Sequence, residues 1–177
     1  MFGVRAPIRR YGSACLRTRA CDADPAAPET RELARRLWRV LDTQDGVGLA
    51  APQLGADRRV IVISEPVAGG ARRRVTLINP VVRRTFGPAV PFAEGCLSFP
   101  GLYVRVMRPQ GVEVEFDDPE QPAGRRTLRD QGLLARVVQH EIDHLEGVLF
   151  IDHLSPLQRL LLAPRLLLIA IRGWLGR

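Results

Sequence analysis

The segment His140-Glu141-Ile142-Asp143-His144, a His-Glu-x-x-His unit, constrains this chain more than any other feature of its sequence. On an α-helix a separation of four positions is about one turn, so His140 and His144 project from one face at the separation that a single divalent metal ion needs. Glu141 lies beside that face, where it can reach a water on the metal. The segment therefore predicts a metal-binding helix that carries its own general base.

A catalytic metal needs a third protein ligand and an open position for water. The candidate is Cys96, in the segment Glu94-Gly95-Cys96-Leu97-Ser98, although a lone cysteine is more commonly a small buried residue. Two alternatives stay open. A zincin-like endopeptidase would take a His or Glu further along the chain, where His153 is the only remaining histidine. A structural metal site in an arginine-rich ribosome-binding module would use four protein ligands and exclude water.

Residues 46–53, Gly-Val-Gly-Leu-Ala-Ala-Pro-Gln, form a third unusual segment of small residues that ends in a side-chain amide. Alone it indicates a tight turn followed by a packed strand or loop. Together with the cysteine segment and the histidine helix, in this order, it resembles the peptide deformylase family. The resemblance extends from about Ile8 to Ser155. Three motifs in the right order are far more specific than a His-Glu-x-x-His unit alone.

The resemblance implies an α+β fold, with antiparallel sheets packed around a central metal-binding helix, in a metallohydrolase domain over residues 1–154. It implies removal of the formyl group from N-formyl-methionine at the start of new proteins, with release of formate. Cys96, His140 and His144 would bind one metal ion, ferrous iron in cells, with Zn²⁺, Ni²⁺ or Co²⁺ also possible. Glu141 would move the protons, and the Gln53 amide and the Leu97 backbone N–H would stabilise the oxyanion.

The candidate substrate-binding residues come from two places in the sequence. The methionine side chain of the substrate needs an apolar cavity, for which Val47, Leu133 and Val137 are candidates, although plain core packing is an equal alternative for each. The backbone from Gly46 to Gly48 carries little side-chain bulk. It could pair with the peptide as an added strand, which would give affinity without much sequence selectivity.

The pattern of apolar residues predicts the elements around these motifs. Residues 29–41 show helical spacing, and short β-branched runs predict strands at residues 59–67, 74–82 and 112–116. The metal helix is expected within residues 131–146. An ion pair between Glu94 and Arg108 is expected to brace the cysteine loop, with two solvated surface charges as an equal alternative. No composition break argues for a second domain.

Residues 155–177 form a predicted helical tail. Ser155-Pro156 is typical of a helix start, and apolar runs at 160–163 and 166–171 are parted by Pro164-Arg165. Neither run has the about 20 apolar residues that cross a bilayer. Packing on its own domain, partner docking, dimerisation and membrane-surface contact all stay open, and the family resemblance implies docking on the ribosome.

Composition limits the partners and the compartment. All 26 basic residues are arginine and the net charge is +7. The charge could serve ribosomal RNA, but scattered arginines without lysine are more typical of GC-rich coding, and no DNA partner is expected. Cys15, Cys21 and Cys96 have no disulfide or zinc-ribbon spacing, and Met1 to Arg10 lack a signal-peptide core. These features predict a cytoplasmic protein.

Overall fold

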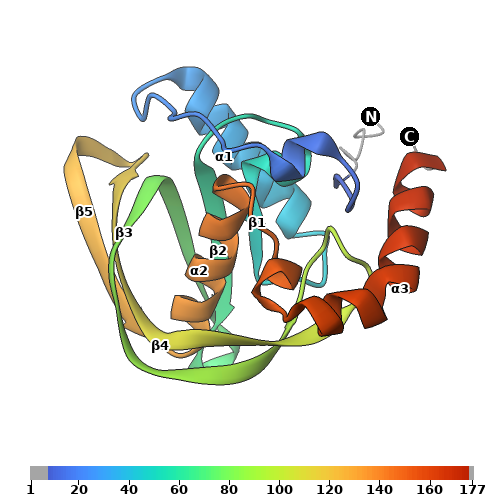
Figure 1. The fold of residues 1–177 in the computed structure, drawn as a ribbon. Coiled ribbons are helices and arrows are strands. Elements are labelled where there is room, and N and C mark those ends of the chain that lie inside the picture. Colours follow the sequence, from blue (N-terminus) through green and yellow to red (C-terminus); the bar gives the residue numbers. More distant parts are fainter. Residues whose placement is uncertain (1–7, 176–177) are drawn as a thin grey trace.

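The computed structural model describes residues 8–175, and at residues 121–123 the backbone alone. Residues 1–7 and 176–177 lie outside this description, and the predictions about the chain start and the end of the tail partly fall on them. The elements, shown in Figure 1, are α1 (Pro28–Leu41), β1 (Gly48–Ala50), β2 (Val60–Pro66), β3 (Arg72–Gly95), β4 (Tyr103–Asp118), β5 (Gln121–Gln131), α2 (Leu133–Leu145) and α3 (Pro156–Leu175). Short 3-10 turns lie at Ala14–Arg17, Ala51–Leu54, Ala68–Gly70 and Phe150–His153.

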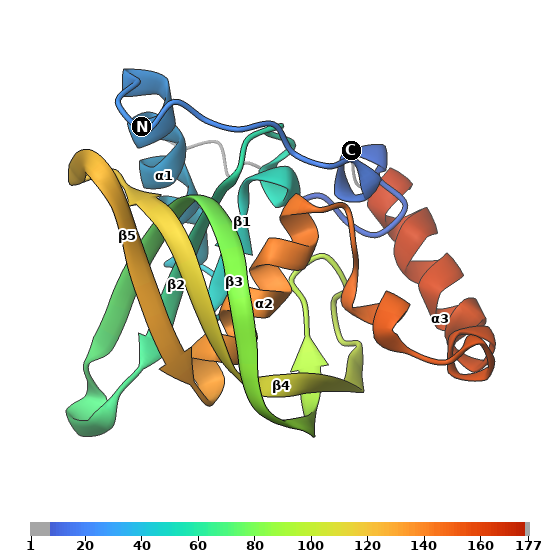
Figure 2. The same ribbon diagram turned by 60° about the vertical axis from the view of Figure 1, so that its left-hand side comes forward.

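The strands form one continuous antiparallel sheet of five strands in the order β1-β2-β3-β4-β5, rather than separate sheets. The 24-residue strand β3 pairs with β2 through its first part and with β4 over most of its length. Three register shifts along the β3–β4 pair mark β-bulges, which bend strands and increase their twist. The sheet therefore curves around α2, as Figure 2 shows, and the end of β3 carries the cysteine segment to that helix.

Helix α2 is the central element of the main core. Its residues from Leu134 to Ile142 are all buried, and Leu134 and Val138 pack against Ile61, Ile63 and Val112 of the sheet. A helix that is buried nearly all round must place its polar side chains against fixed partners or in a cavity. The α+β architecture around a central helix, predicted from the sequence, is confirmed.

Helix α1 covers a second core beside the first. Leu37 and Leu41 pack with Leu49 of β1 and with Val60 and Val62 of β2. The buried positions of α1 recur every three or four residues, as an amphipathic helix requires. This packing holds β1 at the edge of the sheet, where it pairs with β2 alone.

Strand β5 is not among the strands that the sequence predicted. The pattern of apolar residues does not indicate this strand, because it is rich in arginine and Leu128 is its one large buried apolar residue. The arginines pair across the strands instead: Arg126 contacts Asp118 at 2.6 Å and Arg129 contacts Glu113 at 3.9 Å. Cross-strand charge pairs stabilise an antiparallel pair that has one face in solvent.

The predicted helical tail is one helix, α3, which contains both apolar runs. It begins as predicted, with the Gln158 N–H donating to the Ser155 hydroxyl at 3.2 Å. Pro164 lies inside the helix, where it removes one backbone hydrogen bond without ending it. Leu166 is buried with Leu16, Phe99 and other residues of a third core. Within residues 8–175 no helix combines the length and the apolar character that a membrane crossing requires.

Candidate metal and catalytic site

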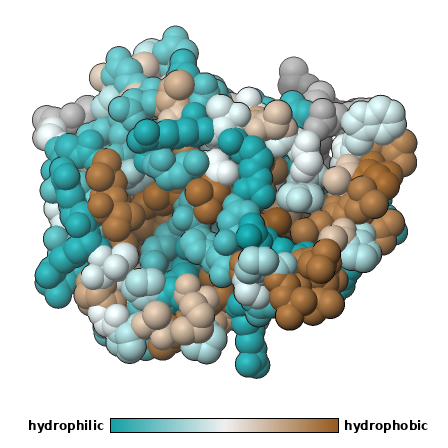
Figure 3. Space-filling model, in the orientation of Figure 1, coloured by the Kyte–Doolittle hydropathy of each residue, from teal (hydrophilic) through white to brown (hydrophobic). Residues whose placement is uncertain are grey.

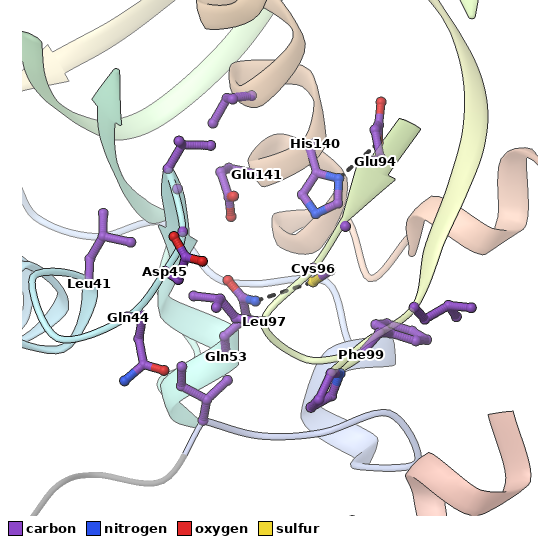
Figure 4. Close-up of a pocket in the computed structure, with 18 of the residues that line it drawn as sticks. Leu41, Gln44, Asp45, Gln53, Glu94, Cys96, Leu97, Phe99, His140 and Glu141 are labelled. Carbon is purple, nitrogen blue, oxygen red and sulfur yellow. Dashed lines mark hydrogen bonds and ion pairs between the residues drawn. The ribbon is translucent and has the colours of Figure 1, made fainter. Parts of the chain in front are cut away.

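The three sequence motifs converge on one cavity of about 1020 Å³ between β1, the loop after β3 and α2. Figure 4 shows Gln53 of the Ala51–Leu54 turn, Cys96 of the loop after β3, and His140 and Glu141 of α2 facing its interior. Residues far apart in the sequence therefore share a single site. Gly46, Val47, Gly48, Leu97, Leu133 and Val137 also line the cavity.

Cys96, His140 and His144 come together as the sequence predicts. One ligand atom from each lies within 4.8 Å of the others, and among residues 8–175 this is the group of three such side chains that could hold a metal ion. The Cys96 Sγ lies 3.2 Å from Nε2 of His144. One thiolate and two imidazoles form a donor set typical of a catalytic transition-metal site, which leaves a fourth position for water.

Glu94 fixes the orientation of His140. Nδ1 of His140 donates to the Glu94 carboxylate at 3.0 Å, which leaves Nε2 as the nitrogen free to bind a metal. Arg108 contacts the same carboxylate at 2.8 Å and Arg136 contacts it at 2.7 Å. Burial alone would raise the pKa of Glu94, but the hydrogen bonds from His140 and Arg108 outweigh it and lower the pKa to about 2. The predicted Glu94–Arg108 pair is confirmed.

Two buried polar atoms at this site have no hydrogen-bond partner among the described residues: Oε2 of Glu141 and Nδ1 of His144. Buried polar groups are nearly always paired, so such atoms indicate that a ligand, ion or water belongs beside them. Burial also holds the pKa of His144 well below its ordinary value, which keeps the imidazole neutral as a metal ligand must be. The residues therefore fit a divalent metal.

Glu141 lies between α2 and β1, facing the cavity (Figure 4). Burial raises its pKa to about 7, against the opposing effect of the His140 and Arg108 charges. Its neighbour across the cavity wall is Gly48, where an added Cβ would lie 2.4 Å from Oε1 of Glu141. The absence of a side chain at Gly48 thus makes room for the carboxylate.

The side-chain amide of Gln53 is held in one orientation. Its Oε1 accepts the Ala50 backbone N–H at 2.8 Å, a position that only the amide oxygen can take. Nε2 therefore points the other way, 3.1 Å from the Ser98 hydroxyl and 3.5 Å from the Cys96 Sγ. The amide donor faces the group of Cys96, His140 and His144, here called the ligand cluster.

His153, the third ligand of the alternative endopeptidase, does not join the cluster. Its Nε2 lies 2.7 Å from the Asp143 carboxylate, which also accepts from Arg108 at 2.7 Å. Within residues 8–175 the candidate metal group has three protein ligands, one fewer than the four that the structural-site alternative needs. The geometry favours a catalytic site.

Sequence reasoning missed several residues around the site. Asp143 and Ser98 lie inside the recognised motifs, yet their contacts with Arg108 and Gln53 join distant segments. Arg136 carried a usable signal, because a charged residue within an apolar helical run must be paired when buried. Arg172 of α3 lines the outer part of the cavity, although the tail was expected to lie away from the chemistry.

The model of the polypeptide deformylase family matches residues 5–160 of this chain. A peptide deformylase from a Picosynechococcus strain is 41% identical over 148 residues, which cover 84% of this chain and 78% of that protein. The crystal structure of a Synechococcus elongatus peptide deformylase in complex with actinonin superposes with a TM-score of 0.80 at 38% identity, covering 89% of this chain and 84% of that one. The Thermus thermophilus enzyme gives a TM-score of 0.83 at 36% identity, covering 94% and 98%. The chain belongs to the peptide deformylase family.

Proposed function

We propose that Cys96, His140 and His144 hold one divalent metal ion, and that this chain uses it to hydrolyse the formyl amide of N-formyl-methionine at the start of new polypeptides. The products are formate and a free amino terminus. The observation that carries the proposal is the cluster of three donor atoms within 4.8 Å of one another, together with the buried Oε2 of Glu141, which has no hydrogen-bond partner among residues 8–175. Family membership supplies the reaction, and the geometry supports the assignment of residues to it.

The donor set suits several metals. One thiolate and two imidazoles are compatible with Fe²⁺, Zn²⁺, Ni²⁺ and Co²⁺, and we propose ferrous iron as the metal in cells. When bound, such an ion lowers the pKa of a water ligand to about 7 and polarises a carbonyl oxygen. Glu94 supports the ligand set by accepting the Nδ1–H of His140 at 3.0 Å.

Glu141 moves the proton in this proposal. Its carboxylate faces the cavity and is not part of the ligand cluster. It takes a proton from the attacking water, whose oxygen forms a bond to the formyl carbon. It then gives that proton to the departing amine as the C–N bond breaks. One carboxylate serves both steps, and burial favours this role because it brings the pKa of Glu141 to about 7.

The oxyanion that develops on the formyl oxygen needs hydrogen-bond donors. We assign the side-chain amide of Gln53 and the backbone N–H of Leu97 to this role. The contact of the Gln53 Oε1 with Ala50 supports it, because the amide donor then faces the ligand cluster before substrate arrives. A donor held in advance costs no reorganisation during the reaction.

The substrate peptide is proposed to pair with the free edge of β1. That strand has β2 as its partner on one side, and Gly46, Val47 and Gly48 line the cavity on the other. The methionine side chain would occupy the apolar wall formed by Val47, Leu133 and Val137. Main-chain pairing gives affinity that depends little on the later residues of the peptide.

We assign the chemistry to residues 1–154 and a packing or docking role to residues 155–177. The ligand cluster, Glu141 and Gln53 all precede α3, while Arg172 of α3 touches the outer part of the cavity. Contact with the ribosome through the tail and a cytoplasmic location stay predictions. The substrate supports both, since new polypeptides are made by ribosomes.

One assay separates this function from the alternatives. The metal-loaded chain is given formyl-Met-Ala and, separately, a long unformylated peptide, and formate and internal cleavage are measured. We expect formate from the first and no cleavage of the second. Actinonin, bound in the Synechococcus elongatus structure, should inhibit the reaction. Internal cleavage without formate would indicate an endopeptidase, and no reaction with a tightly held metal would indicate a structural site.

A further inference from the structure

The proposed function does not require a particular partner for the outer side of α3. The helix packs on the body through one side, where Leu162, Leu166 and Ile169 join the third core. The packing is close: an added Cβ at Gly12 would lie 3.1 Å from the Cβ of Ala170. The contacts therefore fix which side of α3 faces solvent.

Opposite the packed side runs a continuous apolar face with a period of seven residues. It consists of Leu157, Leu160, Leu161, Pro164, Leu167, Leu168, Ile171, Trp174 and Leu175, here called the outer apolar face. Apart from Pro164, the exposed fractions of these side chains run from 44% to 72%. Figure 3 shows hydrophobic side chains gathered over α3 at the right of the view. A contiguous apolar surface of this kind on a folded protein marks an interaction site.

The charges on α3 are all of one sign. Between Pro156 and Leu175 the charged residues are Arg159, Arg165 and Arg172, and there is no acidic side chain. Arg165 and Arg172 are seven residues apart, so they lie on the same edge of the outer apolar face. Within residues 8–175 neither has an acidic partner at salt-bridge distance. The partner must therefore accept apolar side chains and supply negative charge.

These requirements discriminate among the surfaces that could cover the face. A second copy of the chain would bury leucines, but it would bring arginines together without an acidic residue from either helix, on proteins with a net charge of +7. Ribosomal RNA would pair with the arginines but leave the leucines in water. An anionic lipid surface supplies phosphates that pair with arginine and, just below them, an acyl layer that accepts leucine. A helix that lies parallel to the surface reaches both.

We propose that the outer apolar face of α3 lies flat on membrane surfaces rich in anionic phospholipids. Leu161, Leu168 and their neighbours enter the acyl boundary, while Arg165 reaches the phosphates along one edge of the face. Trp174, exposed by 72%, sits at the interface, which indole side chains favour. The stripe from residue 157 to residue 175 is about 27 Å long, which suits a helix lying in the plane of the surface.

The docked enzyme keeps its cleft open to substrate. Arg172 and Gly173 line the outer part of the cavity, whereas the outer apolar face lies on the side of α3 turned away from the body. Lipid docking would therefore hold the cavity mouth beside the membrane surface without filling it. Formylated chains emerging near a membrane would meet the enzyme there.

The test uses the full metal-loaded chain and two kinds of vesicle, one of phosphatidylcholine alone and one with phosphatidylglycerol added in equal part. Binding is measured by flotation and by the fluorescence of Trp174, with Trp174→Phe separating its signal from that of Trp38. The variant is Leu161→Gln with Leu168→Gln. The matched control is Val67→Gln with Val81→Gln, which also replaces two exposed apolar side chains but lies away from α3. Arg165→Gln tests the charge.

We expect the chain and the valine control to float with the anionic vesicles and to bind phosphatidylcholine at least tenfold more weakly. The leucine variant should lose at least tenfold in binding while its rate on formyl-Met-Ala stays within twofold. Arg165→Gln should bind roughly fivefold more weakly, since each surface arginine contributes about that factor. Salt should weaken the binding of the full chain.

Several results would overturn the proposal. Absence of vesicle binding, or equal loss in the leucine and valine variants, would remove the lipid surface as the occupant. A dimer in light scattering that the leucine variant dissociates would assign the face to a second copy. If the full chain co-sediments with ribosomes but does not bind vesicles, and only the leucine variant loses the ribosome binding, the outer apolar face would be assigned to the ribosome. If the leucine variant loses activity on a soluble dipeptide to the same extent as it loses vesicle binding, the face would belong to the catalytic machinery.

Discussion

Gly48 and Glu141 occupy adjoining space across the cavity: a Cβ on Gly48 would lie 2.4 Å from the Glu141 carboxylate and 2.8 Å from the Cγ1 of Val137. The proposed base, Glu141, and the edge strand β1 are therefore packed against each other. A change on β1 reaches the carboxylate directly. The position of the Glu141 carboxylate therefore requires a residue without a Cβ at position 48.

Replacing Gly48 by alanine should therefore damage catalysis. The new methyl group must displace the Glu141 carboxylate or part β1 from α2, and a misplacement of about 1 Å can cost about 10²-fold in rate. We expect kcat on formyl-Met-Ala to fall by about that factor. Gly46→Ala is the comparison, since its Cβ would meet only the flexible Leu97 side chain at 3.1 Å, and should lose far less. Equal losses in both variants would contradict this account.

Glu141→Ala should keep the metal and lose the reaction. Glu141 lies beside the ligand cluster without belonging to it, so metal content measured by elemental analysis should stay near one per chain. The rate should fall by about 10²- to 10⁴-fold, the usual contribution of a positioned acid-base group. Glu141→Gln, which keeps the shape, should lose a similar factor. Metal loss in proportion to activity would show that Glu141 is a ligand.

Cys96→Ser should change the metal site. A serine hydroxyl is a poor ligand for soft or borderline metals, so the variant should hold metal more weakly or shift its preference among the metals tested. Metal content after dialysis against a graded series of chelator concentrations measures the change. Cys15→Ser is a matched control, because Cys15 lies outside the ligand cluster. Unchanged metal retention in Cys96→Ser would exclude Cys96 as a ligand.

The ion-pair cluster at Glu94 predicts a loss of stability in acid. The pKa of Glu94 in the folded protein is about 2, below its ordinary value of 4.5, so the carboxylate stabilises the fold at pH values above about 4.5. That contribution falls as the pH drops from 4.5 towards 2. The difference in unfolding free energy between the metal-free chain and Glu94→Gln should be about 2 kcal/mol smaller at pH 3 than at pH 7, measured by urea unfolding. A difference independent of pH would contradict the role of ionisation.

Two leucines on opposite sides of α3 should differ in their effect on stability. Leu166 is buried in the third core, so Leu166→Ala should lower the free energy of unfolding by about 2 to 4 kcal/mol. Leu161 is 72% exposed, and Leu161→Ala should change it by no more than about 0.5 kcal/mol. Thermal and urea unfolding measure both. Similar losses would mean that the outer side of α3 is also packed on the protein.

The ligand cluster could be predicted because its chemistry is local in sequence. His140, Glu141 and His144 show their relation within one helical turn, and the family motifs add Cys96 and Gln53. The contacts that orient them are not local. Glu94 and His140 are 46 positions apart, and no pattern in either segment states that they meet.

The fold was predictable to a similar extent. Helix α1 and strand β2 were predicted from the pattern of apolar residues, because α1 buries one continuous face and β2 buries one continuous apolar run. Strand β5 was not, because arginines that pair with carboxylates of β4 stand where an apolar pattern would have indicated a strand. The helical tail was predicted, but its continuity through Pro164 depends on tertiary packing, because Leu162 before the proline and Leu166 after it both pack in the third core.

The free edge of β1 has a consequence for the behaviour of the protein at high concentration. An unpaired strand edge that can receive a peptide can also receive a strand from another molecule, which is how aggregation begins. Here the strand is three residues long, from Gly48 to Ala50, and its first residue, Gly48, lines the cavity. A short recessed edge admits one extended chain end but offers little template for a growing stack of strands. The edge that we propose for substrate binding is therefore also expected to be a poor template for pairing between molecules of this protein.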